Sequence, residues 1–471
     1  MSKQNRLTLT LCVCICICSC ILGPRETISA QNARPKIGLV LSGGGARGLA
    51  HIGTLKMLDS LQIPVDFIAG TSMGGIVGGL YACGYSGNEI EKIVLQLNWP
   101  ELFSDKPVRE KIPYLEKKDD GKFQLELGLD GITPVIPGGM IRGQNIILKF
   151  SDLTAAVESI TDFDRLPIPY RCITVDLITG KEVILHSGSL ARAMRATMTI
   201  PTVFTPVEWG DSLLIDGGLL NNLPADVAQL MGADIIIGVN VGTSLRKKKD
   251  LQSIIGILGQ TMVITDYSRQ LLNSELCNVL IQPELGNYSI SDFDNEKVKN
   301  IIRLGEQAAQ KHKQALIDIK NTCFSAVSGK GLQDSASGLK PGLVNKMIPE
   351  KKNPVIYGIV ISGNRNLPFN FINNLLGLKA GDIFNKQVFH DRIQYLYGLG
   401  YFEEISYTLD PVKQNYVRLH INVKEVTLRK LRLGFRYDDA YKLVGIISSR
   451  ANNIPFAGLR GEFTIQFAGL L

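Results

Sequence analysis

A serine lies between two glycines in the segment Gly70-Thr71-Ser72-Met73-Gly74, which has the spacing of a nucleophile turn. A largely apolar run over 65–69 precedes it, and a small-residue segment with a helical pattern follows it. A G-x-S-x-G sequence between a strand and a helix forms a sharp, strained turn that exposes the serine hydroxyl. The flanking residues must be glycine because side chains would collide with neighbouring backbone. The segment predicts an acyl-transferring serine, Ser72, and the alternative interpretation is a tight structural turn.

A serine hydroxyl is inert at neutral pH, so this chemistry also needs a base and an oxyanion site. A buried-strand pattern over 36–42 runs into the loop Gly43-Gly44-Gly45-Ala46-Arg47-Gly48, whose successive amides suit a developing negative charge. Asp216 ends a short apolar strand and is followed by Gly217 and Gly218. To accept the hydroxyl proton, Asp216 needs a pKa that partial burial raises. Asp216 is therefore the candidate base.

Histidine is the more usual partner of a nucleophilic serine, and the chain has five histidines. None lies after Asp216 in the pattern that a Ser, Asp, His order would require. This favours a dyad of Ser72 and Asp216 over a triad, and His51 is interpreted as a packed helix residue. The five are His51, His186, His312, His390 and His420.

The same glycines allow a second interpretation, because Gly43, Gly45 and Gly48 also satisfy the dinucleotide fingerprint G-x-G-x-x-G. Such a site needs an acidic residue at the end of the next strand, whereas Asp66 lies near the start of that strand. The nucleotide interpretation is therefore disfavoured. Arg47 has two open interpretations, support of the glycine loop or contact with a phosphate headgroup.

Taken together, residues 35–316 resemble the bacterial patatin-like phospholipases. The resemblance implies lipid acyl hydrolysis by Ser72 and Asp216, without a metal or an organic cofactor. It implies an oxyanion hole at Gly43, Gly44 and Gly45, with Arg47, Gly48, Gly70, Gly74, Gly217 and Gly218 as supporting motif residues. The family often has serine and alanine near Thr197 and Thr199. This departure from the family pattern puts the local packing in question more than the chemistry. The matching segments are 43–48, 70–74, Asp176-Leu177-Ile178-Thr179-Gly180, Arg195-Ala196-Thr197-Met198-Thr199-Ile200-Pro201 and 216–218.

Composition bounds the remaining possibilities. With 471 residues, 45% apolar content and 20% charged content, the chain is long enough for two or three globular domains. The net charge of +7 comes without basic tracts that contain aromatic residues, so nucleic-acid binding is not expected. Residues 1–30 have the pattern of an export signal that would end at Ala30 and remove five of the nine cysteines. Buried thiols are expected at Cys83, Cys172, Cys277 and Cys323.

Apolar strands alternate with helical patterns over 31–325, which predicts an α/β, three-layer domain with a largely parallel sheet. Leu49, Ile52, Leu55 and Leu58 form one helical stripe, and strands are expected at 235–239 and 279–281. Residues 115–135 have period-two leucines, which favours a surface hairpin over a lipid-facing flap above Ser72. Glycine, serine and lysine over 326–352 indicate a flexible linker.

The order strand, helix, helix, strand, strand over 353–427 resembles a POTRA domain, with a generic α+β module as the alternative. Period-two alternation over 428–471 then resembles the start of an outer-membrane β-barrel of transporter type. An unclosed barrel leaves open strand edges in lipid, so either the sequence is a piece of a longer protein or these strands pair in some other way. The first interpretation is favoured.

These patterns predict an exported lipid acyl hydrolase that a POTRA module attaches to an outer-membrane barrel. Its substrate would be a phospholipid or another acyl ester, and its hydrolase part would face the periplasm or the cell surface. The alternatives are a transport or assembly component with a patatin-like docking module, and a thioesterase or neutral-lipid esterase. The preferred lipid, the ester position and the oligomeric state are not predicted.

Overall fold

The computed structural model describes residues 34–325 and 353–468, apart from 106–108, 243–244, 246–247, 249–250, 440–441, 453–458 and the single positions 113, 118, 120, 132, 137, 253 and 414. The expected export signal and linker therefore lie outside the described residues. In the part of the chain that is described, none of the helices combines the length and the apolar character needed to cross a bilayer.

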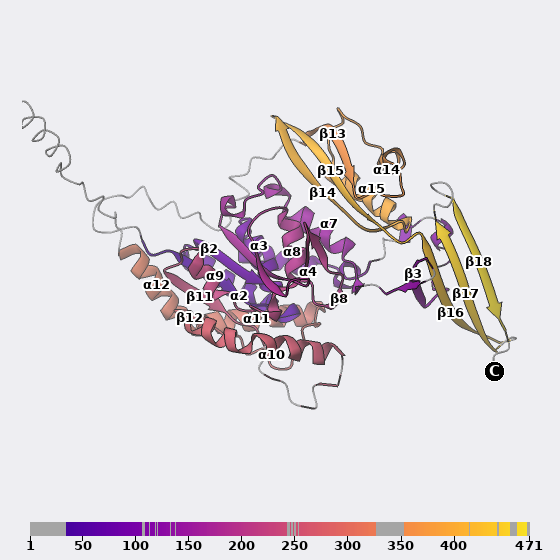
Figure 1. The fold of residues 1–471 in the computed structure, drawn as a ribbon. Coiled ribbons are helices and arrows are strands. Elements are labelled where there is room, and N and C mark those ends of the chain that lie inside the picture. Colours follow the sequence, from indigo (N-terminus) through magenta and orange to yellow (C-terminus); the bar gives the residue numbers. More distant parts are fainter. Residues whose placement is uncertain are drawn as a thin grey trace, which may run out of the picture.

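An eight-stranded sheet forms the centre of the N-terminal module, residues 34–325 (Figure 1). Its order is β12-β11-β1-β2-β6-β10-β9, and β7 pairs with β6. The five strands from β12 to β6 are parallel, whereas β10, β9 and β7 join antiparallel. This confirms the predicted α/β class. The strands are β1 (Ile37–Leu41), β2 (Phe67–Thr71), β6 (Tyr170–Asp176), β7 (Lys181–Leu185), β9 (Val207–Trp209), β10 (Ser212–Asp216), β11 (Ile235–Val239) and β12 (Val279–Ile281).

Helices cover both faces of this sheet. Leu39 and Leu41 pack into one core with α2 and α3, while Val40 packs into a second core with α9. Because neighbouring residues of a strand point to opposite faces, the sheet is the middle of three layers. All four residues of the predicted helical stripe are fully buried. The helices are η1 (Gly45–Ala50), α2 (His51–Leu61), α3 (Met73–Ala82), α4 (Gly87–Gln96), η3 (Ala155–Val157), η4 (Phe163–Arg165), α8 (Leu190–Thr197), η5 (Gly217–Leu219), α9 (Ala225–Leu230), α10 (Ile254–Glu275), α11 (Asn295–Lys311) and α12 (Lys313–Ser325).

Residues 99–153 form an excursion that leaves the three layers and returns to them. It contains α5 (Trp99–Leu102), η2 (Arg109–Lys111), α6 (Tyr114–Lys117), β3 (Leu125–Asp130), β4 (Thr133–Val135), β5 (Gly139–Ile141) and α7 (Gln144–Leu153). Strand β5 pairs with β8 (Thr202–Phe204) of the N-terminal module. Strands β3 and β4 form the hairpin that the sequence predicted within 115–135.

The small module, residues 353–427, has the predicted order of elements. These are β13 (Val355–Ser362), α14 (Phe369–Leu376), α15 (Lys386–Gly398), β14 (Phe402–Lys413) and β15 (Tyr416–Glu425). Its sheet has the order β13-β15-β14, with β13 parallel and β14 antiparallel to β15. Both helices pack on this sheet around one hydrophobic core.

Helix α7 joins the N-terminal module to the small module. The Gln144 side-chain amide donates to the carbonyl of Ile405 at 2.9 Å, and the Ile405 amide donates to Gln144 Oε1 at 2.8 Å. Leu148 packs into the core of the small module. His390 Nδ1 lies 3.1 Å from a carboxylate oxygen of Asp152. The two modules therefore share a specific interface.

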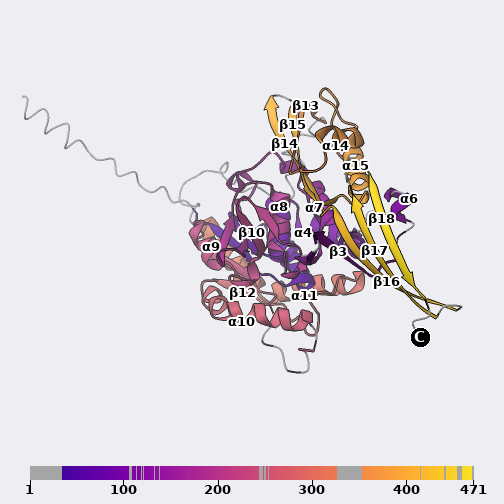
Figure 2. The ribbon, with the colours of Figure 1, turned by 45° about the vertical axis from the view of Figure 1, so that its right-hand side comes forward.

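The C-terminal sheet consists of β16 (Arg429–Asp438), β17 (Lys442–Asn452) and β18 (Arg460–Phe467), which are antiparallel. These strands confirm the alternation predicted from the sequence. The hairpin of the N-terminal module extends this sheet, whose full order is β18-β17-β16-β3-β4 (Figures 1 and 2). No pattern in the sequence indicated that β3 and β16 would pair.

Candidate active site

Ser72 occupies a strained turn between the end of β2 and the start of α3. Its backbone has φ 53° and ψ −125°, a combination that residues with side chains rarely adopt. A Cβ on Gly70 would lie 2.6 Å from the carbonyl oxygen of Gly74, and one on Gly74 would lie 2.2 Å from that of Leu41. Both contacts are impossible for real side chains, so the two glycines are required by the turn.

Two threonine hydroxyls tie this turn to distant parts of the sequence. The Ser72 amide donates to Thr197 Oγ1 at 3.0 Å, and the Thr197 hydroxyl donates to the carbonyl of Ile173 at 2.5 Å. Thr71 Oγ1 donates to the carbonyl of Asn221 at 2.7 Å. Threonine at position 197 thus supplies the hydroxyl that anchors the turn, which gives this departure from the family pattern a structural role.

Asp216 ends β10 and is buried, with 1% of its surface exposed. Its Oδ1 accepts a hydrogen bond from the Gly218 amide at 2.8 Å, and its backbone amide donates to the carbonyl of Thr199 at 2.8 Å. A Cβ on Gly217 would lie 2.4 Å from the carbonyl oxygen of Ile173, so glycine is required directly after the acid.

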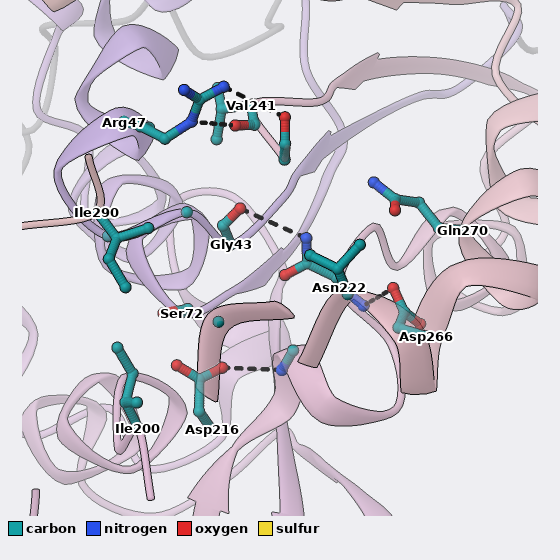
Figure 3. A pocket seen from close by; sticks show the side chains of 16 residues that line it. Gly43, Arg47, Ser72, Ile200, Asp216, Asn222, Val241, Asp266, Gln270 and Ile290 are labelled. Carbon is teal, nitrogen blue, oxygen red and sulfur yellow. Dashed lines mark hydrogen bonds between the residues drawn. The ribbon is translucent and has the colours of Figure 1, made fainter. Parts of the chain in front are cut away.

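Burial raises the pKa of Asp216 to about 6, and this effect outweighs the Gly218 amide and the Ser72 hydroxyl, which both lower it. The carboxylate points toward the space beside Ser72 (Figure 3). Its Oδ2 is buried and has no hydrogen-bond partner among the described residues. The effect of the Ser72 hydroxyl on this pKa indicates that the serine lies near the carboxylate, although no ordinary hydrogen bond joins the two side chains. Catalytic hydrogen bonds often become short only when substrate binds.

The glycine loop lies against the serine. A Cβ on Gly43 would lie 3.0 Å from Ser72 Cβ, and one on Gly45, which has φ 54°, would lie 2.4 Å from the carbonyl oxygen of Ile290. The Gly43 amide donates to the carbonyl of Asn222 at 3.1 Å. By contrast, the amides of Gly44 and Gly45 have no acceptor among the described residues. Of the three predicted oxyanion donors, Gly44 and Gly45 are thus the ones whose amides are not already used.

Arg47 holds the loops around the site together. Its Nε donates to the carbonyl of Val241 at 3.0 Å, and its Nη1 donates to that of Tyr288 at 3.0 Å. The buried side chain thus supports the first of its two interpretations. Gly48 is required for packing, because a Cβ there would lie 2.5 Å from the Met73 side chain.

His51 is a packed residue, as predicted. It is fully buried, and its Nε2 lies 2.7 Å from the carbonyl oxygen of Ser42. Burial lowers its pKa to about 4, so the imidazole is neutral at physiological pH. Asp66 accepts two hydrogen bonds of 2.7 Å from Arg34 and a third from the Ile37 amide, so it has no ribose-binding role.

A pocket opens above Ser72 and Asp216 (Figure 3). One wall comes from α10, through Gly259, Val263, Asp266 and Gln270. No hairpin residue within 115–135 lines this pocket, so the flap interpretation has no support from the described residues. The other lining residues are Gly43, Gly44, Gly45, Arg47, Ser72, Ile200, Asp216, Gly218, Asn222, Val241, Gly242 and Ile290.

Asn222 and Asp266 belong to the site although sequence reasoning did not select them. Asn222 Nδ2 lies 3.5 Å from the carbonyl oxygen of Gly43, and the backbone amide of Asn222 donates to Asp266 Oδ2 at 3.0 Å. Burial raises the pKa of Asp266 to about 7. The position of Asn222 shortly after 216–218 was a usable signal, whereas no local pattern marks Asp266. The described residues contain no group of three or more His, Cys, Asp or Glu that could hold a metal ion.

Two family models match this chain. Residues 39–228 match the model described as patatin-like phospholipase. Residues 354–426 match the POTRA model, described as surface antigen variable number repeat. The chain contains a patatin-like phospholipase domain and a POTRA domain. From here the N-terminal module is called the patatin-like domain and the small module the POTRA domain.

Curated relatives match the patatin-like domain over part of their length. An uncharacterised NTE family protein of Mycobacterium tuberculosis is 32% identical over 213 residues, which are 45% of this chain and 51% of that protein. Patatin-like phospholipase domain-containing protein 6 of Homo sapiens is 34% identical over 211 residues, 44% of this chain and 13% of that protein. The chain thus spans about half of the first relative and a small part of the second.

Solved structures show weaker likenesses. VipD from Legionella pneumophila has a TM-score of 0.36 and 13% identity, covering 60% of this chain and 67% of VipD. BamA from Haemophilus ducreyi lacking POTRA domains 1–3 has a TM-score of 0.22 and 14% identity, covering 24% of this chain and 22% of that one. Both scores are too low to support a functional argument.

Proposed function

We propose that this chain is an exported serine lipid acyl hydrolase of phospholipase A type, with Ser72 as nucleophile and Asp216 as base. The observation that supports this most is the buried carboxylate of Asp216, whose Oδ2 has no hydrogen-bond partner in the described part of the chain and faces the space beside Ser72. Unused amides of Gly44 and Gly45 border the same pocket. Nucleophile, base and oxyanion donors thus converge on one position for an ester carbonyl.

In the proposed reaction, Ser72 Oγ attacks the ester carbonyl carbon while its proton passes to Asp216. The amides of Gly44 and Gly45 stabilise the negative charge on the carbonyl oxygen, and each such donor is typically worth about 3 kcal/mol of barrier. The ester bond then breaks, and Asp216 returns the proton to the alcohol that leaves. Water then attacks the acyl-serine carbonyl carbon while Asp216 takes its proton. The bond between Ser72 Oγ and the acyl group breaks, Asp216 returns the proton to Ser72 Oγ, and the fatty acid is released.

We extend the proposal to the whole chain. Residues 1–30 would be an export signal, 31–325 the patatin-like hydrolase, 326–352 a linker, 353–427 the POTRA domain and 428–471 the first strands of an outer-membrane barrel. The POTRA match and the two-faced alternation of the C-terminal sheet support this arrangement. The hydrolase would then act at the outer membrane, on its periplasmic or its outer side.

A fluorophosphonate probe tests the catalytic proposal, because it reacts only with an activated serine. We expect the purified chain to be labelled on Ser72, as identified by mass spectrometry of the modified peptide, and to release fatty acid from phosphatidylglycerol vesicles. Absence of both labelling and hydrolysis in the folded protein would contradict the proposal and favour a docking role for this domain.

Helix α10 suggests how a bilayer substrate reaches the pocket. Its apolar face, defined as Ile257, Ile264, Tyr267, Leu271 and Leu272, is exposed, although the same helix lines the pocket. Ile264 is 59% exposed and Leu272 64% exposed. The basic sequence 246–249, Arg-Lys-Lys-Lys, precedes this helix. An apolar face that follows a basic run in the sequence favours an anionic lipid surface.

We therefore expect Ile264→Glu to reduce hydrolysis of phosphatidylglycerol vesicles several-fold while hydrolysis of a soluble short-chain ester stays unchanged. The carboxylate of the introduced glutamate would have to lose its hydration each time the apolar face of α10 enters lipid, which is unfavourable. Ile264→Leu, which keeps the face apolar, is the matched control. Equal losses on vesicles and on the soluble ester would instead indicate damage to the pocket.

A further inference from the structure

The hairpin of the patatin-like domain is a structural part of the C-terminal sheet. Strand β3 pairs antiparallel with β16, so that Leu125 lies opposite Leu433 and Leu127 opposite Leu431. Gln124 continues this pairing, because its amide donates to the Leu433 carbonyl at 2.9 Å and its Oε1 accepts from the Phe435 amide at 2.6 Å. Both ribbon views place β3 beside β16 (Figures 1 and 2).

Residues opposite one another in neighbouring strands point to the same face of a sheet, so the registers define two faces. We call one of them the apolar sheet face. It is formed by the odd-numbered residues of β3, β16, β17 and β18. Among them Arg429 is the only charged residue, and it lies at one end of β16. The apolar residues of this face are Leu125, Leu127, Leu129, Leu431, Leu433, Phe435, Tyr437, Leu443, Ile447, Phe463, Ile465 and Phe467.

The opposite face contains an ionic cluster to which the patatin-like domain contributes an acid. Arg432 is fully buried, and its Nη1 lies 2.9 Å from Asp119 Oδ2. Arg460 Nη2 lies 3.1 Å from the same oxygen, and Arg450 and Glu462 complete the cluster. These arginines hold the pKa of Asp119 below its usual value although burial alone would raise it.

On each of its two faces β3 carries the same kind of side chain as the neighbouring strands of the C-terminal sheet. Its leucines extend the apolar sheet face, and Glu126 lies on the other face, 3.7 Å from Lys430 Nζ. Phe123 places its ring 3.9 Å from the guanidinium carbon of Arg432. A surface hairpin in water needs neither the three leucines nor the acid at position 119.

We propose that the β3–β4 hairpin contacts membrane lipid as an added part of the C-terminal sheet, so that the hydrolase itself supplies a segment of the membrane-facing wall. This inference rests on the proposed membrane attachment through 428–471. Acyl chains fit the apolar sheet face because its charge is confined to Arg429 at one end and because it is exposed, with Phe435 at 59% and Phe463 at 67%.

The dimensions agree with a bilayer as the occupant. The ten residues of β16 span about 33 Å, close to the ~30 Å thickness of a hydrocarbon core. On β16, the partners of β3 are confined to Arg429–Leu433, the half of the strand that follows the POTRA domain. Its leucines are therefore expected to meet lipid near the side of the membrane at which β16 enters.

The hairpin is also fixed to the patatin-like domain at its base. Asp105 accepts hydrogen bonds from the amides of Arg142 and Gly143, the latter at 2.7 Å. Arg195 donates from Nη2 to the carbonyl of Arg142 at 2.9 Å, and from Nη1 to Thr199 Oγ1 at 2.7 Å. Insertion of the hairpin would therefore hold the hydrolase in one orientation on the membrane. Because β3 already occupies this edge of β16, any other strand that pairs there has to displace it.

Lipid contact is tested with an environment-sensitive fluorophore on single introduced cysteines in the full chain, reconstituted in phosphatidylglycerol–phosphatidylethanolamine vesicles. The variants are Leu127→Cys, Glu126→Cys on the opposite face, and Phe463→Cys on the apolar sheet face of β18. The parent chain gives the background labelling. Its Cys83, Cys172 and Cys323 are buried, whereas Cys277 is only half-buried, so the expectation of a buried thiol there was wrong. We expect nitroxide-labelled lipid to quench positions 127 and 463 several-fold more strongly than position 126.

Strand pairing is tested by oxidation of the double variant Leu127→Cys/Leu431→Cys, whose Cα positions are direct partners. We expect an intramolecular disulfide here and in the reference pair Leu433→Cys/Ile447→Cys of β16 and β17, and none in Glu126→Cys/Leu431→Cys.

The outcomes separate this inference from the proposals on which it rests. Quenching at 463 without quenching at 127, or a reference disulfide without the 127–431 disulfide, would overturn the hairpin inference alone. Absence of quenching at both positions would overturn membrane attachment as well. A disulfide between two chains of Leu127→Cys would show that a second copy covers the face instead. None of these results depends on whether Ser72 is catalytic.

Discussion

Replacing Ser72 by alanine is expected to abolish hydrolysis of phosphatidylglycerol vesicles, with a loss of kcat on the order of 10³- to 10⁶-fold. Without the hydroxyl no acyl-enzyme forms, and only the oxyanion donors and binding remain to accelerate attack by water. Alanine retains the Cβ and the strained backbone of serine, and the anchoring hydrogen bond to Thr197 comes from the backbone amide. The free energy of unfolding should therefore change little.

Fatty-acid release and thermal unfolding, measured on the same preparation, check both parts of this expectation. Ser60→Ala is the matched control, because Ser60 is exposed near the end of α2 and bonds only within its own helix. Ordinary turnover by the Ser72→Ala protein, with fluorophosphonate labelling lost, would show that the labelled serine is not the nucleophile for lipid.

Asp216→Asn is expected to have the second large effect, a loss of kcat of about 10³-fold or more, because asparagine cannot accept the serine proton. In the unmodified protein the base must be ionised. Since burial raises the pKa of Asp216 to about 6, kcat should rise as pH increases through about 6 and then reach a plateau. A pH profile of vesicle hydrolysis between pH 4.5 and pH 8 gives the test.

The same pKa has the opposite consequence for stability. A carboxyl group with a folded-state pKa above its unfolded value of 3.8 binds protons more tightly when folded, so stability falls as pH rises from about 4 to 6. Above that window the buried charge costs about 3 kcal/mol at most. Asp216→Asn should therefore unfold at the same or a higher temperature than the parent at pH 8, while being inactive.

Asp211→Asn is the control, because Asp211 is exposed in the turn before β10. It should leave both the pH profile and the unfolding temperature unchanged. A parent chain whose kcat does not vary between pH 5 and pH 7 would contradict Asp216 as the base, as would turnover in Asp216→Asn that approaches the parent rate.

The sequence predicted those parts of the site that local backbone rules determine. The turn at Ser72 needs glycine at fixed offsets, and the glycine loop and Asp216 lie at strand ends that apolar runs make visible. These rules act within a few residues, so one sequence is sufficient to find them. The order of elements in the POTRA domain was predictable for the same reason.

Contacts between distant segments were not predictable in this way. Thr197 reaches the Ser72 turn from α8, and Asp266 reaches the pocket from α10. Neither has a distinctive local pattern. The pairing of β3 with β16 joins residues about three hundred positions apart, and the alternation in β3 is equally typical of an isolated hairpin. Only the three-dimensional arrangement separates these possibilities.

The two hydrogen bonds between the Gln144 side chain and the Ile405 backbone have a consequence for the association of one chain with another. Strand β14 lies at the outside of the POTRA sheet, and an outer strand with open amides and carbonyls invites pairing with other chains. At Ile405 the glutamine amide supplies both missing partners, one donor and one acceptor, as a neighbouring strand would. A single side chain of the patatin-like domain thus protects this point of the sheet from becoming a template for intermolecular β-sheet growth.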